Sequence, residues 1–148
     1  MYLMSCLPQL VYQKDGHEIE YFDKYKALQL SWYGHVTSET YMHVLDEMLR
    51  LGIQYQTENW LIDARDVDFM ELGERNWTRN YFRNEVLKCP LKKVARLASG
   101  NFENETYISS FISSVLNGMN LPYKFCYLPD ANSAFEWFSE DDCTSKED

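Results

Sequence analysis

The sequence has few of the residues that disulfide, metal or nucleic-acid chemistry requires. Its four cysteines, Cys6, Cys89, Cys126 and Cys143, include no Cys-x-x-Cys pair and no Cys/His ligand spacing. Neither a disulfide scaffold nor a zinc site is expected, and the pattern is typical of a reducing cytoplasm. Fourteen basic residues against 23 acidic ones give a net charge of −9. Because such a chain repels phosphate backbones and anionic lipid heads, nucleic-acid binding is not expected.

Other signals are missing as well. No apolar run approaches the length of a membrane span, and the first ten residues lack a basic region and contain Pro8, so neither a span nor a signal peptide is expected. Walker, dinucleotide and Gly-x-Ser-x-Gly motifs are absent from the sequence. None of His17, His35 and His43 has a partner at ligand spacing, and each is expected at the surface. We therefore expect no catalytic residue, no metal and no cofactor.

What remains is the composition of an ordinary globular domain. Hydrophobic residues make up 45% of the 148 residues, and aromatic residues 16%. A chain of this size buries enough surface to fold as one domain without staples. The last ten residues hold five carboxylates against one lysine. We expect a folded domain over 1–138 and an acidic, disordered tail over 139–148.

Hydrophobic periodicity and turn residues predict the order β-β-β-α-β-α-β-α-β-α. Asp15-Gly16 predicts a hairpin between the first two strands. The expected strands are 10–13, 19–22, 26–33, 60–63, 93–98 and 123–128. The first expected helix begins at Thr37 or Ser38 and ends at Gly52, and the second covers 72–87. The third begins at the cap Asn104 and ends at Asn117-Gly118, and the fourth follows the cap Asp130. This order predicts a single α/β domain with a mixed, mostly parallel sheet of about five to six strands, an N-terminal antiparallel hairpin and four helices.

The tract from Trp60 to Gly73 holds the densest carboxylate group of the chain, Asp63, Asp66, Asp68 and Glu71. If a strand ends at Asp63 and a loop follows, Asp63 and Asp66 can approach each other at the end of the sheet. Acid–base chemistry or a divalent cation site is then conceivable. Arg65 sits between the two, and aspartates are ordinary turn and cap residues. The sequence favours turn chemistry and leaves the site as the alternative.

Four aromatic residues, Trp32, Tyr33, Trp60 and Trp77, allow two interpretations. Trp32 and Tyr33 end a predicted strand, and Trp77 lies about one turn into the predicted second helix. The group can line a cleft for an apolar or planar ligand beside the acidic tract. Core packing is the simpler interpretation, and the sequence favours it.

The tract and the element order resemble the STAS superfamily, and within it the SpoIIAA-like (STAS/SEC14-type) proteins. Leu61 to Phe69 resembles the strand and short apolar step that precede Asp-Ser-Ser-Gly in the anti-sigma-factor antagonists of that superfamily, and Met70-Glu71-Leu72-Gly73 lies on those four positions. Ala134 to Phe138 is similar to the closing helix of SpoIIAA-like proteins. The resemblance covers roughly residues 10 to 138.

The departures from that motif change what the resemblance implies. In the antagonists the first serine is phosphorylated, whereas here Glu71 and Leu72 replace the two serines. Neither residue offers a hydroxyl, so a serine-phosphorylation switch is not expected. Glu71 either caps its own helix through the helix dipole or presents a fixed negative charge to a partner.

The sequence thus predicts a non-enzymatic regulatory or protein-interaction module of the bacterial cytoplasm. The alternative is a protein that binds a small apolar or lipid-like ligand. A homodimer is also expected, because the apolar stripe of the second helix is broader than one sheet face requires. The candidate partner- or ligand-binding residues are Asp63, Arg65, Asp66, Asp68, Glu71, Gly73, Arg75, Trp77 and Trp32.

Overall fold

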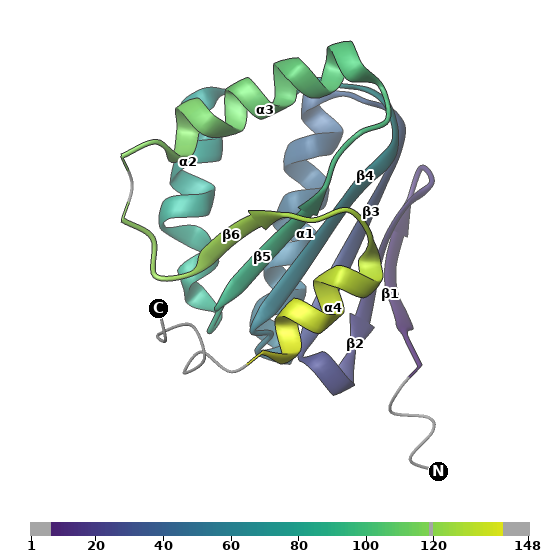
Figure 1. Cartoon of the computed structure of the whole chain (residues 1–148), viewed down its shortest axis with the longest axis vertical. Coiled ribbons are helices and arrows are strands. Elements are labelled where there is room, and N and C mark those ends of the chain that lie inside the picture. Colours follow the sequence, from purple (N-terminus) through teal and green to yellow (C-terminus); the bar gives the residue numbers. More distant parts are fainter. Residues whose placement is uncertain (1–6, 119, 141–148) are drawn as a thin grey trace.

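A computed structural model describes residues 7–118 and 120–140, and Figure 1 shows its elements. The strands are β1 (Gln9–Lys14), β2 (His17–Phe22), β3 (Ala27–Val36), β4 (Asn59–Met70), β5 (Lys93–Leu97) and β6 (Lys124–Tyr127). The α-helices are α1 (Ser38–Tyr55), α2 (Arg75–Arg83), α3 (Phe102–Leu116) and α4 (Ala131–Ser139). Two short 3₁₀ helices, η2 (Asp23–Tyr25) and η3 (Glu85–Lys88), complete the described chain. The predicted acidic tail lies outside the described residues from position 141 onward.

The six strands form one sheet in the order β1-β2-β3-β4-β5-β6. β1, β2 and β3 pair antiparallel, whereas β3 to β6 pair parallel. This confirms the predicted α/β fold, with its N-terminal hairpin, mixed sheet and four helices. Because the strand order follows the chain, the described sheet has no reversal of strand order, which is where doubly wound proteins hold their ligands.

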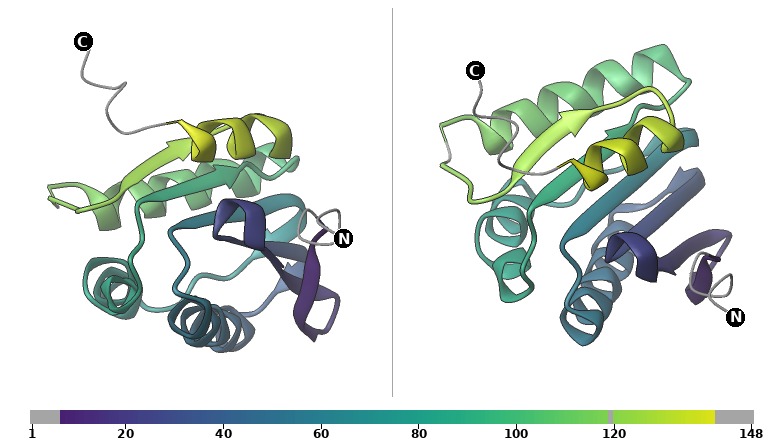
Figure 2. Two further views of the ribbon diagram at one scale, coloured as in Figure 1. Left: turned by 90° about the horizontal axis from the view of Figure 1, so that it is seen from below. Right: turned by 60° about the horizontal axis from the view of Figure 1, so that its bottom comes forward.

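The three crossover helices α1, α2 and α3 share one face of the sheet, and α4 covers the other, as Figure 2 shows. The larger core lies on the crossover side, and the smaller one packs Ala95 and Leu97 against Ala134 and Phe138. Lys93 is buried on the α4 side and donates to the carbonyls of Trp137 and Glu140, at the end of α4. A buried ammonium is tolerated there because carbonyls at a helix C-terminus accept its hydrogen bonds.

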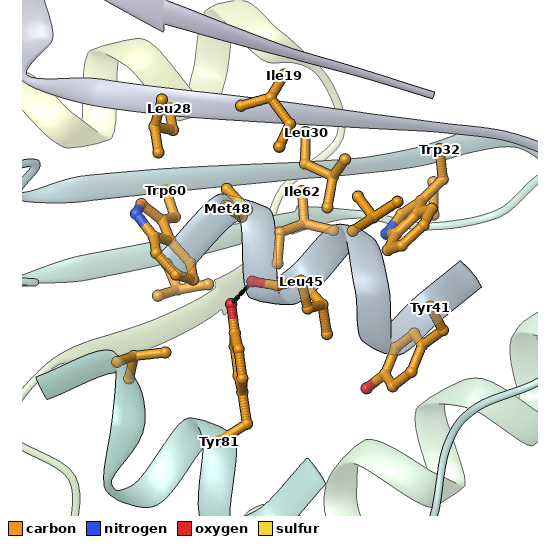
Figure 3. Packing of buried hydrophobic residues seen from close by; sticks show 14 of the residues in the cluster. Ile19, Leu28, Leu30, Trp32, Tyr41, Leu45, Met48, Trp60, Ile62 and Tyr81 are labelled. Carbon is orange, nitrogen blue, oxygen red and sulfur yellow. Dashed lines mark hydrogen bonds between the residues drawn. The ribbon is translucent and has the colours of Figure 1, made fainter. Parts of the chain in front are cut away.

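The larger core is built from large side chains of several elements. Figure 3 shows Ile19, Leu30 and Trp60 of the sheet facing Met48 of α1. Tyr81 of α2 is fully buried, and its hydroxyl donates to the carbonyl of Leu45. This bond satisfies a hydroxyl that burial would otherwise leave without a partner.

β4 is far longer than the strand predicted at 60–63. Two bulges explain the difference: Ser31 pairs with Asp63 but Tyr33 with Asp66, and Gly34 pairs with Val67 but His35 with Phe69. Each bulge adds a residue to β4 and breaks the two-residue alternation from which a strand is recognised. Val67 and Met70 consequently face the core although their spacing is irregular. The three aspartates of the tract therefore lie in a strand and not in a loop, although Asp63 still makes a turn-type bond, accepting from the backbone N–H of Arg65 at 3.0 Å.

The bounds of α1 and α2 differ from the predicted ones. α1 continues through Gly52 to Tyr55, and Gln56 takes the left-handed C-cap position with φ 52°. Gly52 is needed for close packing, since a Cβ there would lie 3.1 Å from the Trp60 ring and 3.2 Å from the Cys89 Sγ. α2 begins at Arg75 and ends at Arg83, where the 3₁₀ helix η3 carries the chain toward Pro90.

The third helix also begins earlier than predicted. Its N-cap is Asn101, whose side-chain oxygen accepts from the backbone N–H of Asn104. Asn104 itself is buried inside the first turn. Its side-chain amide atoms, Nδ2 and Oδ1, have no hydrogen-bond partner in the described structure. Thr37 and Asp130, in contrast, cap α1 and α4 as predicted. None of the helices in the described ranges combines the length and apolar character needed to cross a membrane.

Candidate functional site

The residues singled out from the sequence fall into three separate places. A polar hollow beside the C-terminal half of β4 is lined by Arg65, Asp66 and Asp68. Gly73 and Trp77 line a groove between α1 and the start of α2. Trp32 lines a buried cavity between the sheet and helices α1 to α3. The expected single site around the acidic tract is therefore not formed.

The polar hollow has a volume of about 430 Å³. Beside it Asp63 is already engaged, because the Arg65 guanidinium donates to both of its carboxylate oxygens at 3.0 and 2.9 Å. The main-chain carbonyl of Asp68 accepts from the Asn101 amide at 2.9 Å. The described residues contain no group of three His, Cys, Asp or Glu side chains placed to hold a metal ion. An ion-paired carboxylate is a poor general base, so Asp63 offers little for acid–base chemistry.

Glu71 stabilises a different helix from the one predicted. It precedes α2 by four residues, and its carboxylate lies at the N-terminus of α1, where the Ser38 N–H donates to Oε1 at 3.4 Å. His35 on β3 places its Nε2 3.0 Å from Oε2 of Glu71. The bond with His35, followed by that from Ser38, lowers the pKa of Glu71. Glu71 therefore bonds the N-terminus of α1 and not that of the helix that follows it, and His35 takes part.

Next to this pair lies an open groove of about 610 Å³. Its wall is formed by Ser38, Met42, Leu72, Gly73, Glu74 and Trp77. Gly73 packs tightly, since a Cβ there would lie 3.1 Å from Cγ of Met42. Arg75, the first residue of α2, turns away from the groove and places its guanidinium 5.8 Å from the Phe111 ring of α3.

The four aromatic residues do not line one cleft. Trp60 is fully buried, and Tyr33 is 61% exposed. Trp32 stacks on Tyr41 with ring centroids 6.1 Å apart, while Trp77 meets Tyr41 edge-on at 5.9 Å. Tyr41 therefore lies between the cavity beside Trp32 and the groove beside Trp77, and its ring contacts both tryptophan rings.

The broad apolar stripe of α2 is used within the chain. Tyr81 stacks on Trp77 and meets Phe82 edge-on. The Phe82 carbonyl accepts from the Tyr123 hydroxyl at 2.7 Å. These contacts account for the breadth of the stripe, which was the reason to expect a homodimer. The homodimer itself stays a prediction.

The buried cavity has a volume of about 60 Å³ and an almost wholly apolar wall. Strands β3 to β6 and helices α1 to α3 all contribute to it. Its lining residues are Trp32, Tyr41, Leu45, Ile62, Met70, Leu72, Thr78, Phe82, Arg96, Ile108, Ile112, Val115, Leu116, Tyr123 and Phe125. The lining, apolar with a few polar groups, has the composition of a small-molecule site, but the volume is well below the roughly 300–1,000 Å³ of such sites.

Arg96 is the charged residue in that wall, and sequence reasoning missed it. It is 4% exposed on β5, and its Nη1 lies 2.6 Å from Oε2 of Glu105 on α3. Burial opposes ionisation of Glu105, but hydrogen bonds from Arg96, the Ser99 N–H and the Ser109 hydroxyl outweigh burial and lower its pKa. Nη2 of Arg96 is buried and has no hydrogen-bond partner in the described structure. The signal in the sequence was an arginine inside the apolar run 93–98.

Two hydroxyls complete the polar part of the cavity wall. Tyr41 and Thr78 are both buried, and their hydroxyl oxygens lie 3.2 Å apart. Burial raises the pKa of Tyr41 to about 12, although the bond with Thr78 and the charge of Arg96 act in the opposite direction. Tyr41 is thus neutral over the physiological range, and its hydroxyl makes one hydrogen bond, with Thr78.

Comparisons with known proteins give a likeness to solved structures only. No protein-family model matches the chain, and no curated protein matches it. A crystal structure of an uncharacterised DUF3478 protein from Shewanella loihica PV-4, described as having a SpoIIAA-like fold, is similar to it. The two share 16% sequence identity over 89% of this chain and 92% of that one, with a TM-score of 0.48. At this identity and TM-score the likeness assigns neither a family nor an activity to this chain.

Proposed function

We propose that this protein is a non-enzymatic binding module that takes a small, largely apolar ligand into the cavity between its sheet and helices α1 to α3. The observation that carries the proposal is the cavity itself, with an apolar wall and one buried guanidinium. An empty cavity in a core costs stability, and a bound ligand that fits it recovers the lost contacts. The pairing of Asp63 with Arg65 supports a non-enzymatic role.

Helix α3 is the element that would move to admit a ligand. It covers the cavity through Ile108, Ile112 and Val115. Along its 15 residues only Asn104, Ile108 and Val115 are buried. A helix held by so few buried side chains opens at a lower free-energy cost than the rest of the core. The cavity as it stands is smaller than the roughly 150 Å³ engineered cavity that admits benzene, so a ligand longer than a few carbons requires such movement.

Native mass spectrometry of freshly purified protein tests the proposal. We expect a reproducible small-molecule adduct that is lost in Val115→Phe, because the larger ring fills the cavity. Ser114→Ala, at an exposed neighbouring position of α3, serves as the matched control and should retain the adduct. Absence of any adduct from independent preparations of the wild type would count against the proposal.

The second candidate is a regulatory protein-interaction module, and the groove beside Glu71 favours it. The groove combines the apolar side chains of Met42, Leu72 and Trp77 with a charged rim. Leu72 lines both the groove and the cavity. Occupancy of the cavity can therefore be coupled to the shape of the groove through Leu72 and the Tyr41–Trp77 contact, as regulation requires.

Two charge reversals test this second candidate. Glu71→Lys, beside the groove, and Glu74→Lys, in its wall, should each abolish retention of a specific partner protein in a pull-down while leaving the circular dichroism unchanged. Arg50→Glu, on the exposed side of α1, is the control and should keep the partner. A partner retained by both variants would show that it docks elsewhere.

The cellular setting belongs to the same proposal. Cys89 is a free, buried thiol, and burial raises its pKa to about 11. Such a thiol is unreactive and is compatible with the reducing bacterial cytoplasm expected from the sequence.

A further inference from the structure

Arg96 lines the cavity and carries a buried hydrogen-bond donor without a partner in the described structure, but its charge is balanced. Its positive charge is balanced by Glu105, whose Oε2 lies 2.6 Å from Nη1. The side chains of the two residues are 5% and 15% exposed, so little water screens them. Nη2, in contrast, is buried with no partner in the described structure. The pair therefore needs one more acceptor but no further charge.

We propose that the polar end of the ligand is an uncharged hydrogen-bond acceptor, such as a ketone, ester or amide carbonyl, received by Nη2 of Arg96. This inference rests on the proposed ligand-binding function. A carboxylate would add a second anion beside Glu105 in an apolar surrounding, which leaves one negative charge without compensation. A cationic ligand would face a guanidinium, and a pure hydrocarbon would leave Nη2 without a bond.

Within the described residues no acceptor lies within hydrogen-bonding distance of Nη2. The hydroxyls of Tyr41 and Thr78 bond each other and do not reach it. The ring of Tyr127 lies 5.7 Å from the guanidinium carbon in a cation–π contact. Such a contact is made with the face of the guanidinium and does not accept a hydrogen bond from Nη2. A water molecule would require two to four polar partners of its own, and the cavity wall is almost wholly apolar. A carbonyl attached to an apolar chain meets both demands.

Four matched six-carbon probes test the inference on the whole chain: 2-hexanone, hexanoate, hexylammonium and hexane. Their binding is followed by NMR titration at about pH 7.5, using the Arg96 side-chain N–H signals and the methyl groups of Ile62 and Ile108. We expect 2-hexanone to bind about fivefold more tightly than hexane, the effect of one net hydrogen bond. Hexanoate and hexylammonium should bind at least about tenfold more weakly than 2-hexanone.

Glu105→Gln is the decisive variant because it removes the charge and keeps an acceptor. The glutamine carbonyl can still accept from Arg96, so the guanidinium remains in place but is no longer neutralised. Hexanoate should then bind more tightly than 2-hexanone, which reverses the wild-type order. Glu103→Gln, an exposed position in the first turn of α3, is the control and should keep the wild-type order.

The outcomes separate this inference from the function on which it rests. Tightest binding of hexanoate by the wild type, or equal binding of all four probes, would overturn the neutral-acceptor inference and leave the ligand-binding function standing. If none of the probes, hexane included, gives saturable shifts, the proposed function falls and the inference with it. The wild-type ranking decides by itself should Glu105→Gln fail to fold.

Discussion

Arg96 on β5 and Glu105 on α3 form an ion pair with 2.6 Å between Nη1 and Oε2. The pair joins the strand that forms one wall of the cavity to the helix that forms the opposite wall. Glu105 also accepts from the backbone N–H of Ser99 at 2.8 Å, in the turn between the two elements. The N-terminal end of α3 is thus fixed, while its C-terminal half rests on the apolar contacts of residues such as Val115.

Breaking this pair should destabilise the whole domain. Glu105→Ala leaves Arg96 buried without a counter-charge, so we expect the free energy of unfolding to fall by about 3 kcal/mol. Urea denaturation followed by tryptophan fluorescence measures the change. Glu103→Ala, exposed on the same helix turn, should stay within about 0.5 kcal/mol of the wild type. Equal effects of the two substitutions would refute a structural role for the pair.

The same carboxylate should make the protein sensitive to acid. The folded state lowers the pKa of Glu105 below its ordinary value of 4.5. Its stabilisation is therefore complete above that ordinary value and is lost as the pH falls through it to the lowered folded value. The difference in unfolding free energy between wild type and Glu105→Gln should shrink over this acidic window. A difference that stays constant down to about pH 3 would contradict the prediction.

His17 should add a second pH dependence near neutrality. It is 2% exposed on β2, its Nδ1 accepts from the Tyr33 N–H at 3.1 Å, and its ring meets Trp32 edge-on at 5.2 Å. Burial lowers its pKa from 6.5, although Asp15 acts in the opposite direction. The folded state thus favours neutral imidazole, and stability is complete above 6.5 and falls as the pH drops through that value.

Denaturation midpoints between about pH 7.5 and pH 5.5 measure this effect. His17→Asn, which does not titrate, should flatten the slope of stability against pH. His43→Gln, at an exposed position on α1, should leave the slope unchanged. A slope that follows His43 instead would show that the buried histidine is not the titrating group. The surface position predicted for His17 from the sequence is wrong.

Gly52 offers a test of close packing behind the cavity. A methyl group there would press on the Trp60 ring and on Cys89, so we expect Gly52→Ala to cost about 1–3 kcal/mol of unfolding free energy. Gly100→Ala is the matched control, because a Cβ there meets only the Arg65 carbonyl at an ordinary 3.6 Å. Equal stability of the two variants would show that α1 can shift to admit the methyl group.

The parts of the fold that depend only on residues close in the sequence were predictable. Asp15-Gly16 forms the hairpin turn between β1 and β2. Thr37 and Asp130 cap their helices through side-chain oxygens that accept from backbone N–H groups three residues on. Such signals are local, because the partner atoms lie within a single turn of chain.

The bulged strand marks where sequence reasoning failed. Asp63 was expected as the last residue of a strand and Asp66 in the loop beyond it, but both lie within β4. The alternation that identifies a strand is interrupted by two extra residues, and only pairing with β3 reveals that the strand continues. The carboxylates of the tract consequently spread along a strand and do not gather at its end.

The sequence by itself determined the order of the elements, the α/β class and the caps of α1 and α4, because periodicity and turn chemistry act over a few residues. The tertiary structure decided which polar groups meet. Glu71 reaches His35 across 36 positions of the chain, and Arg96 meets Glu105 only because α3 folds back over β5. The balance of charge in the cavity, and with it the kind of ligand proposed, depends on that crossover and on the burial that it creates.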